Sequence, residues 1–314
     1  MNTERFIKRI AFLIVFALVI SLAILGVACN EEDDSSTAEV EKVRVVVSIS
    51  PLAEFVEQVG GDNVEVSIMV PSEADLHIYD PDPSQLVELS KADLYVKVGS
   101  GVEFETAYMD SIEKANSRML VVDSSEGIDL IEMIGHHHED DNKGEDDHGM
   151  DPHVWLSPVN AKTMVENICD SLIDVDPDSE VFYTRNRDDY LKKLDQLDAD
   201  ISGALSGVTN RHFIVFHPAW GYFAQAYELE QIPIEVEGKN PSSEYLTHLI
   251  EEALGQDIKI VFASPQFNME SAQIIADEIG NDEYGGRVIL IDPLARDYIN
   301  NLHMVLGEMV QAME

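Results

Sequence analysis

Four side chains of the types that bind metal ions lie after or beside short apolar runs in the sequence. His217 comes directly after the run HFIVF and Asp292 directly after RVILI, while His77 lies in the polar segment that follows VEVSIMV. His153 lies in DPHVWLSP, where a proline stands on each side of a short apolar piece. Ligands of open parallel sheets bind outside the carboxyl ends of the strands, so these four side chains are expected to converge. Three imidazoles and one carboxylate are enough for the four-coordinate sphere that suits zinc.

Each of these four residues also has a structural interpretation. A single histidine after a strand is often a hydrogen-bonded structural residue, and an aspartate before a proline often forms a turn or a helix cap. The metal interpretation therefore depends on all four together. Three further histidines have no evident partner at the carboxyl end of a strand and are interpreted as structural: His212, His248 and His303.

The stretch HHHEDDNKGEDDHGMDPHVW, residues 136–155, holds five of the ten histidines of the chain. His153 is assigned to the rigid site, but the loop before it, residues 135–150, is rich in Asp, Glu, Asn and Gly and can bury little apolar surface. This loop either binds extra zinc weakly beside the main site or is a solvated acidic insertion without a role. Its auxiliary metal-binding residues would be His136, His137, His138 and His148.

Short β-branched runs alternate with helical patterns along most of the chain. The runs are RVVVSIS, VEVSIMV, DLYVKVG and MLVVD in the first half, and HFIVF, IPIEV, IKIVF and RVILI in the second. Runs of this length and composition are typical of strands buried on both faces of a mainly parallel sheet. Segments between them, such as PLAEFVEQVGG and SSEYLTHLIEEALG, have helical spacing. The predicted fold class is therefore α/β, with two lobes that each hold a mainly parallel sheet flanked by helices.

One long, rigid helix is expected to join the two lobes. Residues 176–207 begin with Asp-Pro-Asp, which is typical of a helix start, and they carry one apolar face formed by Tyr190, Leu194, Leu197, Ile201 and Leu205. The N-terminal metal-binding lobe is accordingly assigned to residues 42–175 and the C-terminal one to residues 208–314. The alternative is an ordinary helix at the edge of one lobe.

The N-terminal residues have the pattern of a secretion signal. Arg5, Lys8 and Arg9 precede an almost wholly apolar run, residues 10–28, that ends at Cys29. Such a run before a cysteine and a polar segment resembles a lipoprotein signal. We therefore expect residues 1–28 to be a signal peptide, Cys29 to carry the lipid and residues 29–41 to form a linker. The alternative is an uncleaved transmembrane anchor, and both interpretations place the folded chain outside the cytoplasm on the membrane surface.

The chain contains 60 acidic and 20 basic residues and has a net charge of −40. A charge of this sign repels phosphate backbones, which excludes nucleic acid as a partner. The excess is spread over the whole chain, so it indicates a surface adapted to high salt more than a local field that concentrates cations near a cleft. Cys169 is the only cysteine besides Cys29, so no disulfide framework is expected and Cys169 is interpreted as an inert core thiol.

The order of several motifs resembles one family over nearly the whole chain. After Cys29 come PSEADLHIYDPDPSQL, the acidic histidine-rich stretch, DPHVWLSP, the long helix, FHPAWGYFAQAYEL, EGKNPSSEYL, VFASPQF and IDPL. This order is similar to that of the zinc/manganese ABC-transporter solute-binding lipoproteins. The resemblance implies two α/β lobes on a rigid helix with one metal ion in the cleft. It places the metal ligands on His77, His153, His217 and Asp292.

The resemblance also implies a role and partners. A protein of this family captures a metal ion at the outer face of the cytoplasmic membrane and hands it to the permease of an ABC importer, which works with an ATPase. His217 resembles the histidine of zinc members rather than the glutamate common in manganese members, and nitrogen ligands favour zinc. Zn²⁺ is therefore the expected ion and Mn²⁺ the alternative, bound by a monomer.

Two other classes of function are alternatives to transport. A zinc hydrolase needs an open coordination position and a general base. The sequence has no HExxH motif, and four protein ligands would close the sphere, so an enzyme is not expected. The second alternative is a surface adhesin with a structural metal, which the family resemblance allows as an additional role. Metal exchange distinguishes a transport protein from an adhesin with a structural metal, because a transport protein must release its ion and a structural site need not.

Overall fold

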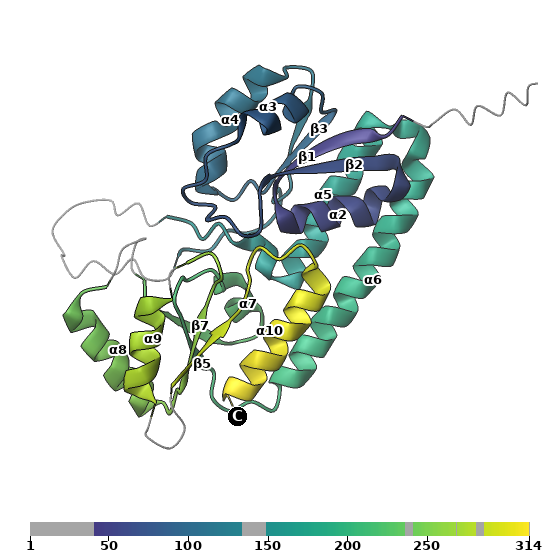
Figure 1. Ribbon diagram of the computed structural model, residues 1–314. Coiled ribbons are helices and arrows are strands. Elements are labelled where there is room, and N and C mark those ends of the chain that lie inside the picture. Colours follow the sequence, from purple (N-terminus) through teal and green to yellow (C-terminus); the bar gives the residue numbers. More distant parts are fainter. Residues whose placement is uncertain (1–40, 134–148, 236–240, 268, 281–285, 314) are drawn as a thin grey trace, which may run out of the picture. The chain divides into compact units, whose positions relative to one another are not determined.

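Strands and helices alternate along the chain and build a parallel sheet in each of two lobes (Figure 1). The computed structural model describes residues 41–133, 149–235, 241–267, 269–280 and 286–313. From Lys42 onward these residues belong to one unit, Lys42–Glu314. The α/β class with two lobes that the sequence predicts is confirmed.

The N-terminal lobe has the strand order β2-β1-β3-β4, and every neighbouring pair is parallel. Its strands are β1 (Val43–Ile49), β2 (Val64–Val70), β3 (Leu94–Lys97) and β4 (Leu120–Asp123). Its helices are α2 (Ser50–Gly60), α3 (Pro83–Leu89), α4 (Glu103–Ala115) and α5 (Pro158–Val175). Short 3-10 turns are η1 (Gly61–Asn63), η2 (Val154–Leu156) and η3 (Pro177–Ser179).

The C-terminal lobe repeats this order as β6-β5-β7-β8, again with parallel neighbours. Its strands are β5 (His212–Val215), β6 (Glu230–Pro233), β7 (Ile260–Ala263) and β8 (Arg287–Leu290). Its helices are α7 (Gly221–Ala226), α8 (Ser243–Gly255), α9 (Glu270–Ile279) and α10 (Tyr298–Met313).

Strand β6 begins two residues before the predicted run IPIEV, because pairing with β5 decides its position. Glu230 lies opposite His212, and Pro233 lies opposite Val215. Proline cannot donate a ladder hydrogen bond, but β6 is an edge strand, where this is tolerated.

Helix α6 (Glu180–Leu205) runs along both lobes (Figure 1). Its 26 residues span about 39 Å at the usual rise of an α-helix. It packs on α2 and α5 of the N-terminal lobe and on α10 of the C-terminal lobe. Its buried face contains the five predicted apolar residues together with Tyr183. Asp176, the first residue of the segment expected to form this helix, makes no capping hydrogen bond with its side chain, which accepts a hydrogen bond from Oη of Tyr183 at 2.7 Å.

One apolar core is continuous through both lobes. It contains Phe55 of α2, Leu197 of α6 and Tyr298 of α10, and it reaches Phe213 of β5. Ile214 points to the other face of the C-terminal sheet and belongs to a second cluster with residues of α8 and α9, because successive side chains of a strand alternate between faces. The continuous core therefore fixes one face of the C-terminal sheet to the N-terminal lobe.

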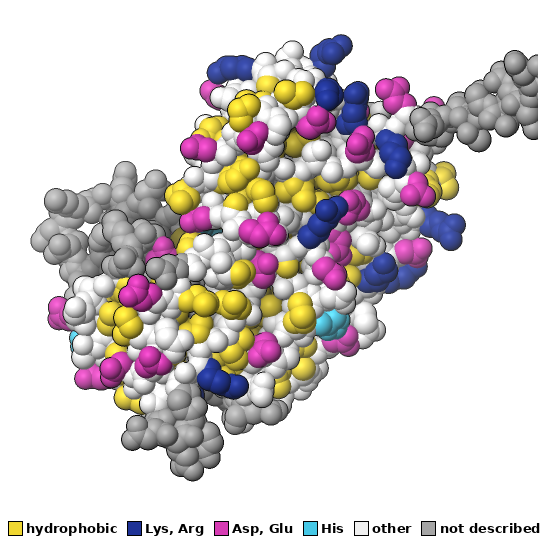
Figure 2. Space-filling view, in the orientation of Figure 1, with side chains coloured by type: hydrophobic (Ala, Val, Ile, Leu, Met, Phe, Trp, Pro, Cys, Tyr) yellow, Lys and Arg dark blue, Asp and Glu magenta, His cyan; other side chains and the backbone are white. Residues whose placement is uncertain are grey.

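Acidic side chains are spread over both lobes on the visible face, whereas most of the Lys and Arg side chains in view lie over the N-terminal lobe and along α6 (Figure 2). This spread agrees with a general acidic surface. No helix within the described part of the chain combines the length and the apolar character needed to cross a membrane.

Candidate metal centre

In the C-terminal lobe, the residues that follow each strand contribute to one small site. His217 lies just after β5 and Glu235 just after β6, and Nδ1 of His217 is 3.0 Å from Oε2 of Glu235. The residues that follow β7 and β8 line the cavity beside His217: Gln266, Phe267, Pro293 and Leu294. The site thus lies at the carboxyl ends of the parallel strands, as the fold class predicts.

In the N-terminal lobe, His77 is held in the loop between β2 and α3. Its backbone N–H donates to Oδ1 of Asp75 at 2.9 Å. A capping box formed by Asp82 and Gln85 begins α3. Nε2 of Gln85 also donates to the carbonyl oxygen of Met69 at 2.5 Å. This hydrogen bond connects the start of α3, where the loop ends, to the end of β2.

His153 comes from the segment that follows β4 and stands directly before η2. Its Nδ1 and its backbone N–H both donate to Oδ1 of Asp151, at 2.8 and 2.9 Å. Both residues are 1% exposed. Oγ of Ser100 donates to the carbonyl oxygen of Pro152 at 2.5 Å, which fastens this segment to the loop after β3.

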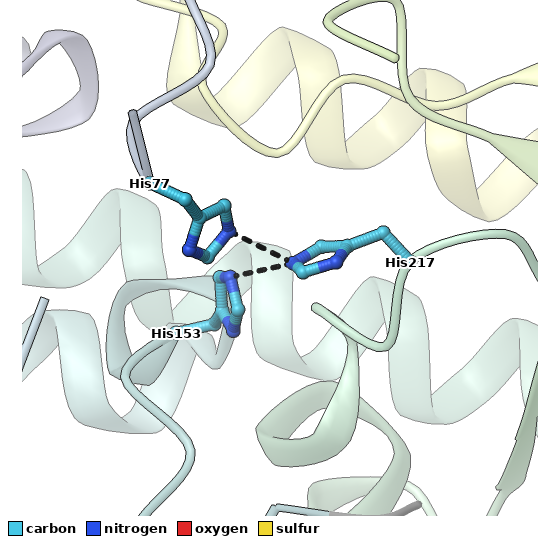
Figure 3. Close-up of side chains that lie close together, drawn as sticks. All are labelled: His77, His153 and His217. Atoms are coloured by element: carbon cyan, nitrogen blue, oxygen red, sulfur yellow. Dashed lines mark hydrogen bonds between the residues drawn. The ribbon is translucent and has the colours of Figure 1, made fainter. Parts of the chain in front are cut away.

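The three histidines direct their Nε2 atoms toward a common point (Figure 3). Nε2 of His217 lies 3.2 Å from Nε2 of His77 and 3.4 Å from Nε2 of His153. Ligand atoms of all three lie within 4.8 Å of one another. In a tetrahedral site, Zn–N bonds of about 2.0–2.1 Å place two nitrogen ligands about 3.3 Å apart. The cluster therefore fits a shared zinc ion.

The ring nitrogens that face away from the cluster are paired with carboxylates. Nδ1 of His77 lies 2.9 Å from Oε2 of Glu103, and the other two histidines are paired with Asp151 and Glu235 as described above. A carboxylate at Nδ1 holds the proton there and leaves the lone pair of Nε2 for a metal. The three negative charges also offset the charge of a divalent cation.

Burial and neighbouring charges shift the pKa values of two of the clustered histidines in opposite directions. Burial lowers the pKa of His77, but the hydrogen bond and the charge of Glu103 outweigh it and leave this pKa raised. For His217, burial is the largest effect, and with repulsion from the other two imidazoles it outweighs Glu235 and lowers the pKa. His77 therefore takes up a proton at higher pH than His217.

The cavity beside the cluster is small and mostly apolar. Its volume is about 10 Å³, close to the space that one water molecule needs. The ring of Phe267 forms one wall of the cavity, and its centroid lies 4.8 Å from that of the His217 ring. A space of this size has room for one water molecule and excludes an organic substrate.

Asp292 lies just after β8, where the sequence places it, but among the described residues only the three histidines come together as potential metal ligands. Oδ1 of Asp292 accepts hydrogen bonds from Nε2 of Gln266 at 2.8 Å and from the backbone N–H of Leu294 at 2.9 Å. Its role as the fourth ligand stays a prediction. The observed contacts connect Asp292 to the cavity through Gln266.

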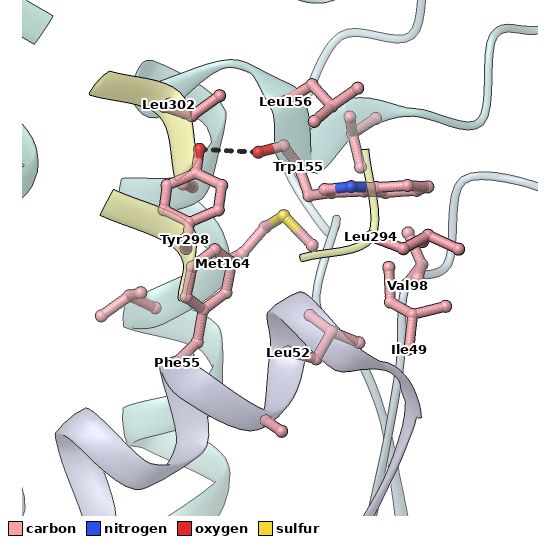
Figure 4. Close-up of a cluster of buried hydrophobic side chains, with 14 of the residues drawn as sticks. Ile49, Leu52, Phe55, Val98, Trp155, Leu156, Met164, Leu294, Tyr298 and Leu302 are labelled. Atoms are coloured by element: carbon pink, nitrogen blue, oxygen red, sulfur yellow. Dashed lines mark hydrogen bonds between the residues drawn. The ribbon is translucent and has the colours of Figure 1, made fainter. Parts of the chain in front are cut away.

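The loop between β8 and α10 links a wall of the cavity to the N-terminal lobe. Nε1 of Trp155 donates to the carbonyl oxygen of Pro293 at 2.7 Å. Oη of Tyr298 donates to the carbonyl oxygen of Trp155 at 2.7 Å (Figure 4). The backbone N–H of Tyr298, at the start of α10, donates to Oε2 of Glu54 at 2.5 Å. Residues of both lobes therefore hold this loop in place.

The other predicted residues lie apart from the cluster. His212, His248 and His303 each lie within 3.9 Å of a carboxylate and outside the histidine cluster, and their structural role stays a prediction. Burial raises the pKa of the Cys169 thiol to about 11, which agrees with an inert core cysteine. Five predicted residues lie outside the described part of the chain: Cys29, His136, His137, His138 and His148.

Two parallel α/β lobes on one long helix, with a histidine cluster built from both lobes, define a metal-binding protein of the solute-binding class. Residues 45–312 match the family of ZnuA, the periplasmic component A of the zinc-uptake complex. The chain belongs to this family, which confirms the resemblance inferred from the order of its motifs. Members of this family are metal-binding components of an uptake complex. The expectation that the chain is not an enzyme is therefore also confirmed.

Individual relatives agree with this assignment. The chain is 31% identical over 265 residues to the high-affinity zinc uptake system protein ZnuA of Bacillus subtilis (strain 168), and the match covers 82% of each protein. It is 29% identical over 283 residues to the zinc-binding lipoprotein AdcA of Streptococcus pneumoniae (strain ATCC BAA-255 / R6), covering 87% of this chain and 53% of AdcA. A crystal structure of ZnuA matches with a TM-score of 0.80 and 39% identity, covering 87% of this chain and 100% of that one.

Proposed function

We propose that this chain captures Zn²⁺ between its two lobes and delivers it to the permease of an ABC importer that is driven by an ATPase. The main support for the proposal is the spacing of the Nε2 atoms. Nε2 of His217 lies 3.2 Å from that of His77 and 3.4 Å from that of His153. His77 and His153 of the N-terminal lobe and His217 of the C-terminal lobe bind the ion. Asp292 supports the site from the end of β8.

Zinc is the proposed cargo because all three converging ligand atoms are imidazole nitrogens. Imidazole suits zinc, whereas Mn²⁺ prefers oxygen ligands. The names of the relatives support this choice, since they refer to zinc uptake and zinc binding. Mn²⁺ is the alternative ion and is expected to bind more weakly.

We further propose that the chain is anchored through its N-terminus. In this proposal residues 1–28 are a signal peptide, Cys29 carries a lipid, and residues 29–41 tether a monomer to the outer face of the cytoplasmic membrane. The periplasmic location in the family description and the name of the lipoprotein AdcA support this arrangement. The acidic stretch before His153 collects zinc weakly beside the main site.

Competitive titration of the metal-free protein with Zn²⁺ and Mn²⁺ against a chromophoric chelator tests the binding function. We expect one tight zinc site per chain and weaker binding of Mn²⁺. His217→Ala removes a ligand and should lower zinc affinity at least as much as loss of an outer partner does, about 10–100-fold.

His212→Ala is the matched control, because His212 begins β5 and lies outside the cluster. This variant should bind zinc as the wild-type protein does. Equal affinities of the two variants would remove His217 from the site, and a wild-type protein that binds no zinc would refute the proposed function.

A further inference from the structure

We propose that Gln266 orients a water molecule that occupies the fourth coordination position of the bound zinc ion. This inference rests on the proposed function and names the group that completes a sphere of three nitrogen ligands. The water donates a hydrogen bond to Oε1 of Gln266. Asp292 then acts on the ion through Gln266 and does not bind it directly.

The contacts of Gln266 fix the orientation of its amide group. Nε2 donates to the carbonyl oxygen of Ser72 at 2.6 Å and to Oδ1 of Asp292 at 2.8 Å. A carbonyl oxygen and an ionised carboxylate only accept hydrogen bonds, so the nitrogen of the amide must be the atom that faces them. Oε1 of Gln266 is therefore directed away from both partners.

This oxygen is buried and has no hydrogen-bond donor among the described residues. The side chain of Gln266 lines the cavity beside the three histidines. Buried acceptors without a donor are rare, because they lose the hydrogen bonds that water would supply. The histidines do not supply one, since their Nδ1 atoms are paired with carboxylates and their Nε2 atoms face one another.

A water molecule bound to zinc supplies the missing donor. Zinc with three protein ligands commonly takes water as its fourth ligand, and the cavity of about 10 Å³ has the size of one water molecule. The charge of Asp292 polarises the amide through Nε2, which makes Oε1 a stronger acceptor. Gln266 is therefore a positioning residue that acts through the water.

The zinc affinities of Gln266→Leu, Gln266→Glu and the wild-type protein test the role of Oε1 by chelator competition. Gln266→Leu removes the acceptor and should lower affinity on the order of tenfold, as expected for loss of an outer partner. Gln266→Glu keeps an acceptor oxygen and should retain more affinity than Gln266→Leu. Thermal unfolding of each metal-free variant shows whether it is folded.

Gln256→Leu is the matched control. Oε1 of Gln256 is also buried and unpaired in the described part of the chain, but Gln256 lies near the amino end of β5, where its carbonyl oxygen accepts from Nδ2 of Asn210 at 3.1 Å. Its zinc affinity should equal that of the wild-type protein. With Co²⁺ as a spectroscopic probe, Gln266→Leu should shift the visible absorption bands and Gln256→Leu should not.

A crystal structure of the zinc-loaded wild-type protein gives a measurement that needs no variant. We expect a non-protein oxygen about 2.0–2.2 Å from zinc and about 2.7–3.0 Å from Oε1 of Gln266. Direct ligation of zinc by Asp292 or by Gln266, or equal zinc affinities of Gln266→Leu and the wild-type protein, would overturn this inference while leaving the proposed function intact. A wild-type protein that binds no zinc would overturn both.

Discussion

The pairing of Asp151 with His153 allows a test in which zinc affinity and protein stability respond differently. Asp151→Asn keeps the shape of the side chain and removes its charge. Oδ1 of Asp151 accepts two hydrogen bonds from His153, at 2.8 and 2.9 Å, and both residues are 1% exposed. An amide oxygen in this place is a weaker acceptor, so His153 becomes a weaker ligand for zinc.

The expected magnitudes follow from the burial of this pair. Loss of an outer carboxylate partner typically lowers metal affinity about 10–100-fold, or ~1.4–2.8 kcal/mol. The same substitution should not lower the stability of the metal-free protein, because Oδ2 of Asp151 is buried with no hydrogen-bond partner in the described structure. A buried charge with an unpaired oxygen is unfavourable. Metal-free Asp151→Asn should therefore unfold at the same temperature as the wild-type protein or at a higher one.

Chelator competition measures the zinc affinity, and thermal unfolding followed by circular dichroism measures the stability. Glu230→Gln is the matched control, since Oε2 of Glu230 lies 3.0 Å from Nε2 of His212 at the other end of β5. This control should leave zinc affinity unchanged. Wild-type affinity in Asp151→Asn, or a loss of affinity that merely follows unfolding, would refute the reasoning.

Three further predictions concern pH, fluorescence and the acidic stretch. Zinc affinity should fall as the pH falls from about 7 to 5, because protons compete for the imidazoles. Glu103 raises the pKa of His77, so Glu103→Gln should move this loss to lower pH in chelator competition, and an unchanged pH profile would contradict it. The ring of Trp155 lies 5.3 Å from that of His153, so zinc should change the tryptophan emission, and Trp155→Phe should remove more of this signal than Trp220→Phe. The reverse order would contradict the placement of Trp155. Deleting residues 136–148 should abolish only weak additional binding in equilibrium dialysis, and loss of tight binding would make this stretch the primary site.

The fold is predictable from this sequence because strands buried on both faces appear as short continuous apolar runs. The run RVILI contains β8 and VEVSIMV is β2 itself. The position of β6 is not predictable in the same way, because it depends on pairing with a strand that lies elsewhere in the sequence. The apolar run IPIEV predicts a strand in this region, but the strand begins at Glu230 because Glu230 pairs with His212 of β5.

The candidate ligands are predictable because the carboxyl ends of parallel strands meet at one edge of a sheet. The partners of these ligands are harder to predict. Asp151 stands two residues before His153 and so has a local signal, whereas Glu103 begins α4 and carries no mark of its contact with His77. Asp292 could not be placed from the end of its strand alone, since its hydrogen bond from Leu294 is local but its hydrogen bond from Gln266 depends on the loop that follows β7.

The unequal exposure of the three histidines has a consequence for the kinetics of metal release. The side chain of His77 is 19% exposed, against 7% for His217 and 1% for His153. The neighbouring Ile78 is 80% exposed. We therefore expect incoming water to reach a bound ion first beside His77. The bond to His77 should then be the first to exchange, and the loop between β2 and α3 should set the dissociation rate.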